Sequence, residues 1–202
     1  MWWDMAPGMR DEFEEWHTRE HFPERLALPG FLRASRWADA GAGEGFFVMY
    51  EVSQRDDLAS PEYLARLNAP TPWSRQLMPH HRNMVRSQCV VLESTGALTA
   101  SQLLTYRFSP GTDENGGREH SRGVIARLVQ QRGVAGAHLL KTDAPVVPTT
   151  TEQHIRGNAD RQADWILLVA TQARALPPKI DLPEGTMGRY SLSLAVLGSD
   201  LA

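Results

Sequence analysis

The pattern of apolar and polar positions in residues 1–94 predicts the element order βαββαβ. Pro7 is tolerated in the first turn of a helix, and Pro29-Gly30 ends one, so these residues delimit the first helix. The glycine-rich stretch 41–45 predicts a hairpin between the two middle strands. The expected elements are a strand at 1–5, a helix at about 7–28, strands at 31–38 and 46–52, a helix at 61–67, a broken helical segment at 70–79 and a strand at 84–92.

Residues 100–198 repeat this order with weaker helices, which predicts an internal repeat. Pro177, Pro178 and Pro183 exclude a continuous helix before the last strand. The link at 94–99 has neither proline nor a run of charges, so we expect two docked units, at 1–96 and 100–202. The expected elements of the second unit are a strand at 102–108, a helix at 118–131 and strands at 137–142, 165–171 and 189–197.

The strands predict an α+β fold with sheets that are covered on both faces. A βαββαβ unit is an antiparallel sheet with helices on one face only, so its other face needs a cover. Residues 46–52 are apolar in both parities apart from Glu51, and 165–170 is apolar throughout, which is typical of a sheet buried on both sides. We therefore expect two tandem units whose antiparallel sheets pack together within one chain as a barrel, the first unit carrying the candidate pocket and the second supporting it.

Composition and charge exclude several classes of partner. The chain has 202 residues, 42% hydrophobic and 22% charged, with a net charge of −3, so no basic surface for nucleic acid is expected. The longest apolar run, 165–170, is too short to span a membrane, and the start of the chain lacks a secretory signal. Cys89 is the only cysteine, which excludes an intrachain disulfide and a cysteine metal cluster. We expect a cytoplasmic protein without a membrane partner.

The first predicted helix carries polar side chains on its apolar face. Steps of 100° per residue place His17, Glu20 and Glu24 on the apolar stripe and His21 at its edge. Because an isolated buried charge is costly, these groups indicate either an ion-pair network or a polar pocket. In a pocket, His17 or His21 would exchange protons with a ligand, since histidine titrates near neutral pH. In a network, Glu20 or Glu24 would pair with Arg25, Arg33 or Arg36.

Three further candidates lie before the closing strand of the first unit. His80 and His81 follow Pro79, and Trp73 precedes them, so all three could line the same pocket. Each also has a structural interpretation. Histidines at a helix end cap carbonyl groups or lie in solvent, and Trp73 would hold its loop as a hydrophobic plug.

The segment His17-Thr18-Arg19-Glu20-His21 matches the H-x-x-E-H pattern of inverted zinc peptidases. Two histidines four residues apart can share a zinc ion, the intervening glutamate can act as a base, and Glu93 could supply a third ligand. The flanking residues do not resemble those peptidases, and a five-residue pattern arises easily by chance. A zinc hydrolase is therefore kept as an alternative, and our leading prediction has no metal and no cofactor.

The link from the first helix to the second strand has a recognisable sequence. It runs Trp16-His17-Thr18-Arg19-Glu20-His21-Phe22-Pro23-Glu24-Arg25 and then Pro29-Gly30-Phe31-Leu32-Arg33-Ala34-Ser35-Arg36. This resembles the same segment in the dimeric α+β barrel superfamily, whose ferredoxin-like units occur in antibiotic-biosynthesis monooxygenases, muconolactone isomerases and EthD-like proteins. The likeness is closest to uncharacterised bacterial members in which two such units are fused. It implies a barrel made from one chain and a space for small aromatic or polycyclic compounds.

The leading prediction is a small-molecule-binding protein, acting without a cofactor as an oxygenase, isomerase or lyase on an aromatic or polyketide-like compound. His17 and His21 are the acid–base candidates, with Glu20 orienting an imidazole and Arg25 or Arg36 holding a carboxylate or enolate. Trp73, His80 and His81 are the further candidate ligand contacts. The alternatives are a non-catalytic binding or structural barrel and the zinc hydrolase, and the sequence allows either a monomer with an internal pseudo-dimer or a homodimer.

Overall fold

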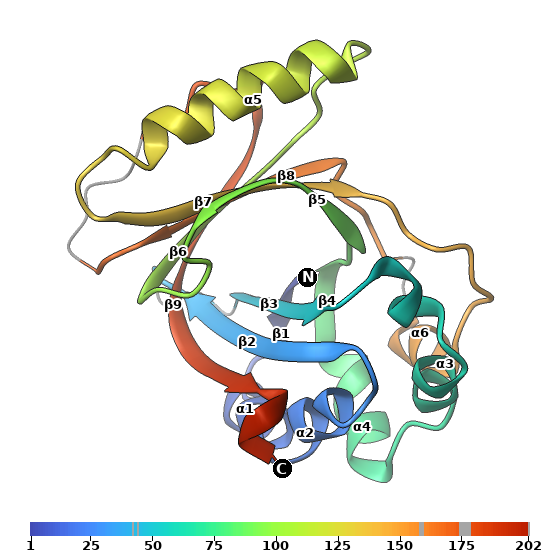
Figure 1. The fold of residues 1–202 in the computed structure, drawn as a ribbon. Coiled ribbons are helices and arrows are strands. Elements are labelled where there is room, and N and C mark those ends of the chain that lie inside the picture. Colours follow the sequence, from blue (N-terminus) through green and yellow to red (C-terminus); the bar gives the residue numbers. More distant parts are fainter. Residues whose placement is uncertain (42, 44, 158–159, 174–178, 202) are drawn as a thin grey trace. The chain divides into compact units, whose positions relative to one another are not determined.

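The computed structural model describes residues 1–41, 43, 45–157, 160–173 and 179–201, which form two compact units (Figure 1). Unit 1 comprises Met1–Gln88, Ala144–Arg161 and Ser193–Ala202, and unit 2 comprises Cys89–Asp143 and Gln162–Leu192. The boundaries differ from the expected division at 96–100, because two segments of the second half of the chain pack with the first. Hydrophobic periodicity is a local signal and does not reveal such a return.

Unit 1 contains an antiparallel sheet with strands in the order β4-β1-β3-β2. Helices α1 and α2 lie on one face of it (Figure 1). The elements are β1 (Trp2–Met5), α1 (Arg10–Trp16), the π-helical turn η1 (His17–His21), α2 (Phe22–Leu26), β2 (Phe31–Asp39), β3 (Gly45–Val52), the 3₁₀ turn η2 (Arg55–Ala59), α3 (Pro61–Asn68), α4 (Pro72–Leu77), the 3₁₀ turn η3 (Met78–His80) and β4 (His81–Val85). The returning segments add α6 (Thr151–Arg156) and the 3₁₀ turn η4 (Gly198–Leu201).

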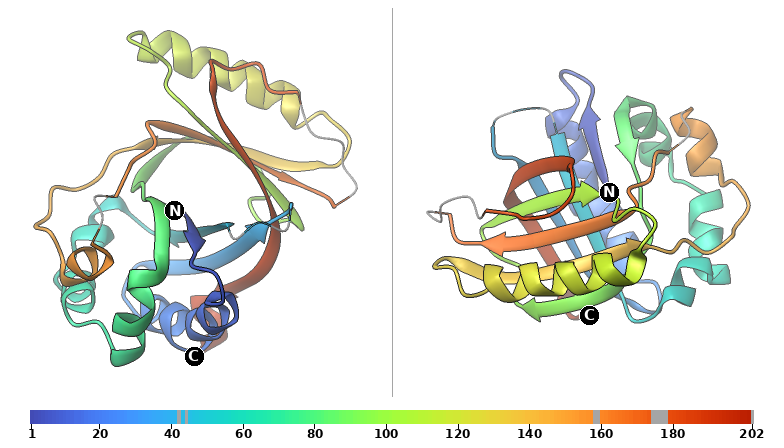
Figure 2. Two further views of the ribbon diagram at one scale, coloured as in Figure 1. Left: turned by 180° about the vertical axis from the view of Figure 1, so that it is seen from behind. Right: turned by 90° about the horizontal axis from the view of Figure 1, so that it is seen from above.

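Unit 2 contains antiparallel strands in the order β9-β6-β8-β7-β5, with α5 along one face (Figure 2). Every residue of β8 is buried, as its uninterrupted apolar sequence predicts. Val124, Ile125 and Leu128 of α5 pack on the buried side chains of the strands. The elements are β5 (Cys89–Gly96), β6 (Gln102–Phe108), α5 (Glu114–Leu128), β7 (Val134–Thr142), β8 (Trp165–Thr171) and β9 (Gly185–Leu197), whose last residues belong to unit 1.

The α+β class and the antiparallel strands are confirmed. The relationship of the units by duplication and their packing as a barrel stay predictions. The expected hairpin at 41–45 includes Ala42 and Glu44, and the expected irregular connection includes Pro177 and Pro178, all of which lie outside the described residues. Within the described part of the chain, no helix is long and apolar enough to cross a bilayer.

Two predicted elements differ from those observed, and one observed helix was not predicted. The strand expected at 84–92 is two strands, β4 and β5, which belong to different units, because the alternation of Val85, Ser87, Cys89 and Val91 continues across the break. Helix α5 begins earlier than expected, at Glu114, where the Asp113 side chain accepts a hydrogen bond from the Gly116 amide. Helix α6 was not predicted.

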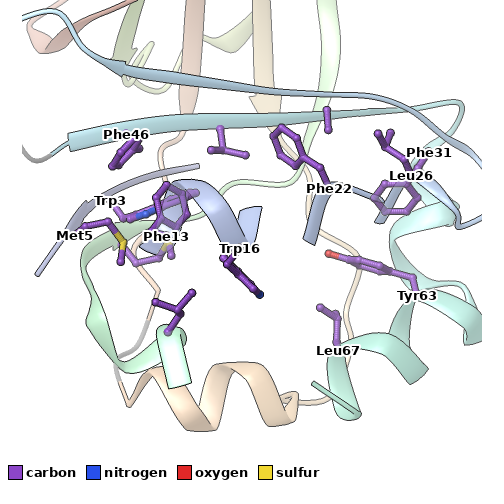
Figure 3. Packing of buried hydrophobic residues seen from close by; sticks show 14 residues of the cluster. Trp3, Met5, Phe13, Trp16, Phe22, Leu26, Phe31, Phe46, Tyr63 and Leu67 are labelled. Carbon is purple, nitrogen blue, oxygen red and sulfur yellow. The ribbon is translucent and has the colours of Figure 1, made fainter. Parts of the chain in front are cut away.

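The core of unit 1 is built around Phe13, which is fully buried (Figure 3). Its ring centroid lies 4.7 Å from that of Phe46 on β3 and 5.6 Å from that of Trp3 on β1. These contacts fix α1 against the sheet, because aromatic side chains bury large apolar areas and prefer such edge-on or tilted arrangements. The apolar stripe of the first helix is therefore the surface that packs on the strands.

Gly30, in the turn between α2 and β2, is expected to tolerate no side chain. Its φ is +82°, and a Cβ atom there would lie 2.3 Å from the carboxylate of Asp57. Gly8 is a matched control, because its φ is +78° and a Cβ atom there meets nothing within 4 Å. Both alanine variants incur left-handed strain of about 1–2 kcal/mol, and Gly30→Ala must also displace Asp57. Chemical denaturation should show Gly30→Ala to be the less stable of the two, and equal stabilities would contradict the steric argument.

Candidate functional site

A cavity of about 80 Å³, partly open to solvent, lies within unit 1. It is larger than one water molecule requires and smaller than the engineered cavity of about 150 Å³ that holds benzene. A ligand with a full aromatic ring would therefore extend into the opening. Aromatic and aliphatic side chains form most of the wall, and the polar groups on it include three histidines, three arginines, two tyrosines and one glutamate: His17, His21, His81, Arg25, Arg86, Arg156, Tyr50, Tyr63 and Glu152.

The first two histidines lie on a π-helical turn between α1 and α2. The Phe22 amide donates to the carbonyl of His17, five residues earlier, which widens the helix at this point. Pro23 gives a physical reason, since proline has no amide hydrogen and its ring clashes with the carbonyl four residues before it. The turn presents His17 and His21 side by side, with stacked rings whose centroids are 5.4 Å apart.

Both imidazoles are neutral at pH 7. Burial lowers the pKa of His17 well below its usual value, and the charge of Arg36 lowers it further. Burial likewise lowers the pKa of His21, with Arg25 the next largest cause. The Nδ1 atom of each ring is buried and accepts or donates no hydrogen bond among the described residues. The Tyr50 hydroxyl lies 3.5 Å from Nε2 of His17, and burial raises the pKa of Tyr50, so this phenol keeps its proton.

His81 at the start of β4 is the third histidine of the wall. Its Nδ1 lies 3.2 Å from the carbonyl oxygens of both Leu77 and Met78. Because carbonyls only accept hydrogen bonds, this contact assigns the proton of the neutral ring to Nδ1 and leaves Nε2 as an acceptor. Burial lowers the pKa of His81 to about 4. All three histidines are thus uncharged, because burial and the nearby arginine charges both disfavour the protonated ring.

Two of the three arginines of the wall are paired with carboxylates. Arg25 on α2, which is 3% exposed, donates to Glu152 on α6. Burial raises the pKa of Glu152, and Arg25 opposes that rise. Burial opposes the charge of Arg25 and is the largest single effect, but Glu152, Tyr63, Glu24 and Tyr50 together outweigh it, so the pKa of Arg25 is raised. Arg156 pairs with Asp160 at 2.8 Å, whereas Arg86 donates to the Tyr63 hydroxyl at 3.2 Å.

The structure brings together four of the eight residues predicted from the sequence. His17, His21, Arg25 and His81 all line the cavity. His21 and Glu24 are 3.8 Å apart, which is beyond hydrogen-bond distance. The sequence analysis offered a polar pocket or an ion-pair network as alternatives. The structure has both in the same place, since buried ion pairs form part of the cavity wall.

The other four predicted residues do not line this cavity. The Glu20 carboxylate accepts hydrogen bonds from Trp16 Nε1 at 3.0 Å and from the Thr71 hydroxyl, so it holds the indole rather than an imidazole. Arg36 donates to the Glu14 carbonyl at 2.9 Å.

The remaining two contact neighbouring helices or solvent. The indole of Trp73 donates to Glu12 at 2.7 Å, and its ring packs against the core, in agreement with the plug interpretation. His80 is half-buried at the end of η3. The expected contribution of Trp73 and His80 to the ligand site therefore has no counterpart in the geometry of this cavity.

Sequence reasoning missed most of the charged wall. Glu152 and Arg156 come from α6, and a signal for this helix exists in the sequence. Thr150 and Gln153 form a capping box, in which each side chain bonds the other residue's backbone amide. Tyr50, Tyr63 and Arg86 carry no comparable local signal.

The donor set for the zinc alternative is incomplete. Among the residues that the structure describes, no group of three or more histidine, cysteine, aspartate or glutamate side chains could hold a metal ion. The carboxylate of Glu20 is bound by Trp16 and Thr71, and Glu93 is bound by Arg118 and Arg122 at 2.9 and 2.7 Å. The H-x-x-E-H pattern here forms a helical turn in which only the two histidines face the cavity.

Comparisons with family models and with curated proteins found no match. Among solved structures, an anthrone oxidase-like protein matches with a TM-score of 0.63 and 9% identity over 100% of this chain and 92% of that chain. A proposed monooxygenase from Fusobacterium nucleatum gives 0.55 and 7% over 96% and 90%, and one from Lactobacillus acidophilus gives 0.53 and 8% over 98% and 94%. The chain therefore has the α+β fold of these three proteins.

Proposed function

We propose that unit 1 binds a small aromatic compound and that His17 and His21 move a proton to or from it. One observation carries this proposal. Two neutral imidazoles lie stacked on the wall of a partly open cavity, and the buried Nδ1 atom of each has no hydrogen-bond partner among the residues that the structure describes. Buried polar atoms are almost always satisfied, so two adjacent exceptions in a cavity favour a bound ligand that supplies the partner.

The proposed chemistry is removal of a proton from an acidic C–H or O–H group of the ligand. A neutral imidazole accepts that proton and leaves an enolate or phenolate. Burial and the arginine charges hold the pKa values of His17 and His21 low, which opposes this step in the empty cavity. An anionic ligand reverses part of that effect, because a negative charge beside an imidazole favours its protonated form. The protonated Tyr50 hydroxyl can donate a hydrogen bond to the developing anion.

An oxygenase reaction of a small aromatic or polyketide-like compound is the favoured outcome of this step. The solved structures of similar fold are described as anthrone oxidase-like and as proposed monooxygenases, and this supports an oxygenase class. In such a reaction, the carbanion formed by deprotonation would be oxidised by dioxygen, with formation of a C–O bond to give a peroxide anion. The imidazolium would return its proton to that anion, and the hydroperoxide would lose water to leave a carbonyl group. Return of the proton to a different carbon would instead give an isomerase, and both reactions begin with the same proton transfer.

A non-catalytic binding protein is the second candidate, and the low pKa values of the histidines favour it. A weak base that stays neutral still donates and accepts hydrogen bonds to a ligand. Both an enzyme and a binding protein would bind the ligand, but only the enzyme would convert it. A measurement of dioxygen uptake and product formation with hydroxylated aromatic compounds therefore separates the two candidates.

Replacing His17 or His21 with alanine is expected to reduce kcat by about 10²–10⁴-fold, which is the usual contribution of a general acid or base. The readout is dioxygen uptake with a hydroxylated aromatic substrate, after circular dichroism has shown that each variant folds. His17→Gln and His21→Gln keep the side chains large and guard against collapse of the cavity. His154→Ala is the matched control, because His154 is exposed on α6 and lies off the wall. A folded variant that carries both His17→Ala and His21→Ala and keeps full turnover would refute the proposed acid–base roles.

A further inference from the structure

The charges on the cavity wall do not balance. Three guanidinium groups line the cavity, and Glu152 is the only carboxylate among the lining residues. Glu152 pairs with Arg25, and Arg156 is paired with Asp160, which lies off the wall. The histidines add no positive charge, because burial keeps them neutral.

Among the described residues, Arg86 makes no ion pair. Burial opposes its charge, but Tyr63, Asp160 and Glu152 together raise the pKa of Arg86, so it stays charged. Its guanidinium has one polar side-chain contact in the described part of the chain, the Tyr63 hydroxyl at 3.2 Å, and no carboxylate there lies within 4.0 Å of it. A guanidinium has five N–H donors in a planar fork, so a single phenol leaves most of them unused. Carboxylates match that fork through two parallel hydrogen bonds.

The backbone holds Arg86 in place. Its amide donates to the Arg161 carbonyl at 2.8 Å, and the Arg161 amide donates to the Met84 carbonyl at 3.2 Å. Val85 forms a parallel bridge with Arg161, so the returning segment of unit 1 is joined to the end of β4. A cation on a fixed backbone loses little freedom when it binds an anion, which favours recognition.

We propose that the ligand of unit 1 carries a carboxylate and that Arg86, oriented by Tyr63, binds it. The inference rests on the proposed function for the location of the ligand, and it names the substrate class as small aromatic carboxylates. The apolar part of such a ligand would lie against Phe31, Leu67 and Met84, which line the same cavity. The sequence analysis expected Arg25 or Arg36 to hold the ligand's carboxylate or enolate. We assign this role to Arg86 instead, because Arg25 is paired with Glu152 and Arg36 does not line the cavity.

Binding to matched probes tests the assignment. Benzoate and benzamide have nearly the same shape and differ in charge, and acetate and acetamide form a smaller pair for a cavity of about 80 Å³. Calorimetry on the full chain should show that at least one carboxylate binds about 10- to 100-fold more tightly than its amide. Arg86→Gln should abolish that preference, and Tyr63→Phe should reduce it by a few fold. Arg82→Gln, a change at an exposed arginine on β4, should leave it intact.

Equal affinity for acid and amide, a preference that persists in folded Arg86→Gln, or no binding of either carboxylate would overturn the inference. Nuclear magnetic resonance of the histidines provides an independent readout, because a bound carboxylate should raise the pKa of the imidazoles beside it. Failure of the proposed function is distinguishable. A carboxylate preference that depends on Arg86, without turnover of any aromatic acid, would support the binding site and refute the acid–base chemistry.

Discussion

Replacing Glu152 with alanine is expected to lower the free energy of unfolding by about 3–5 kcal/mol, the usual cost of removing one partner of a buried ion pair. The change leaves the Arg25 guanidinium 3% exposed without its hydrogen-bonded carboxylate. Among the described residues, Nη1 of Arg25 already makes no hydrogen bond, so the change adds Nη2 to the buried donors without a partner. Glu24 lies 3.8 Å away and offsets only part of the lost interaction.

Urea denaturation of three variants would test the cause as well as the size of this effect. Glu15→Ala removes a surface pair with Arg19 in which both side chains are largely exposed, and it should cost less than about 1 kcal/mol. The double variant Arg25→Met, Glu152→Leu removes both charges, and it should be more stable than Glu152→Ala. If the double variant is as unstable as Glu152→Ala, the loss comes from packing rather than from a stranded charge.

Acidification from about pH 6.5 to about pH 4 is expected to destabilise the protein, and His81 alone should contribute about 3 kcal/mol of the loss. Burial lowers the folded-state pKa of His81 to about 4, from the ordinary histidine pKa of 6.5 that it has in the unfolded chain. Between these values the unfolded chain binds a proton that the folded chain does not, so stability falls as the pH falls. Above this window the ring is neutral in both states, and the loss vanishes. His17 and His21 act in the same direction.

The variant His81→Asn isolates this contribution. The asparagine amide can still donate to the carbonyls of Leu77 and Met78, but it does not titrate. Its stability at neutral pH will change because the packing against Trp3 changes, so the comparison concerns the slope of the unfolding free energy with pH. A smaller slope than in the parent protein supports the assignment, and an unchanged slope between the two pH values contradicts it.

The candidate site depends on segments that are far apart in the sequence. The bond between Arg25 and Glu152 joins residues 127 positions apart, and it closes the cavity wall between the first helices and the returning segment. The same segment supports Arg86 through the backbone of Arg161. Ligand binding and stability should therefore be coupled through α6, since this short helix carries one of the buried charges.

The local pattern predicted a helical segment before the second strand and the side of it that carries His17. Periodicity placed His17 on the inward face of the helix with His21 at its edge, and both line the cavity. The same pattern placed Glu20 inward, and its carboxylate is indeed within unit 1, bonded to Trp16 and Thr71. Periodicity assigns a side chain to a face, but it does not say which neighbour that side chain will contact, so the predicted roles of Glu20 and Arg36 differ from their observed contacts.

The amino-acid sequence alone determined the α+β class, the order of most strands and helices, and the inward position of His17 with His21 at the edge of the same face, because each depends on the spacing of residues within one element. Only the tertiary structure decided that α6 returns to unit 1, that Glu152 pairs with Arg25, and that Arg86 faces the cavity with a phenol as its partner. The physical reason is that burial and charge pairing are long-range properties. Burial and charge pairing depend on contacts between segments that are far apart in the sequence, and these contacts determine the protonation of the histidines and the charges on the cavity wall.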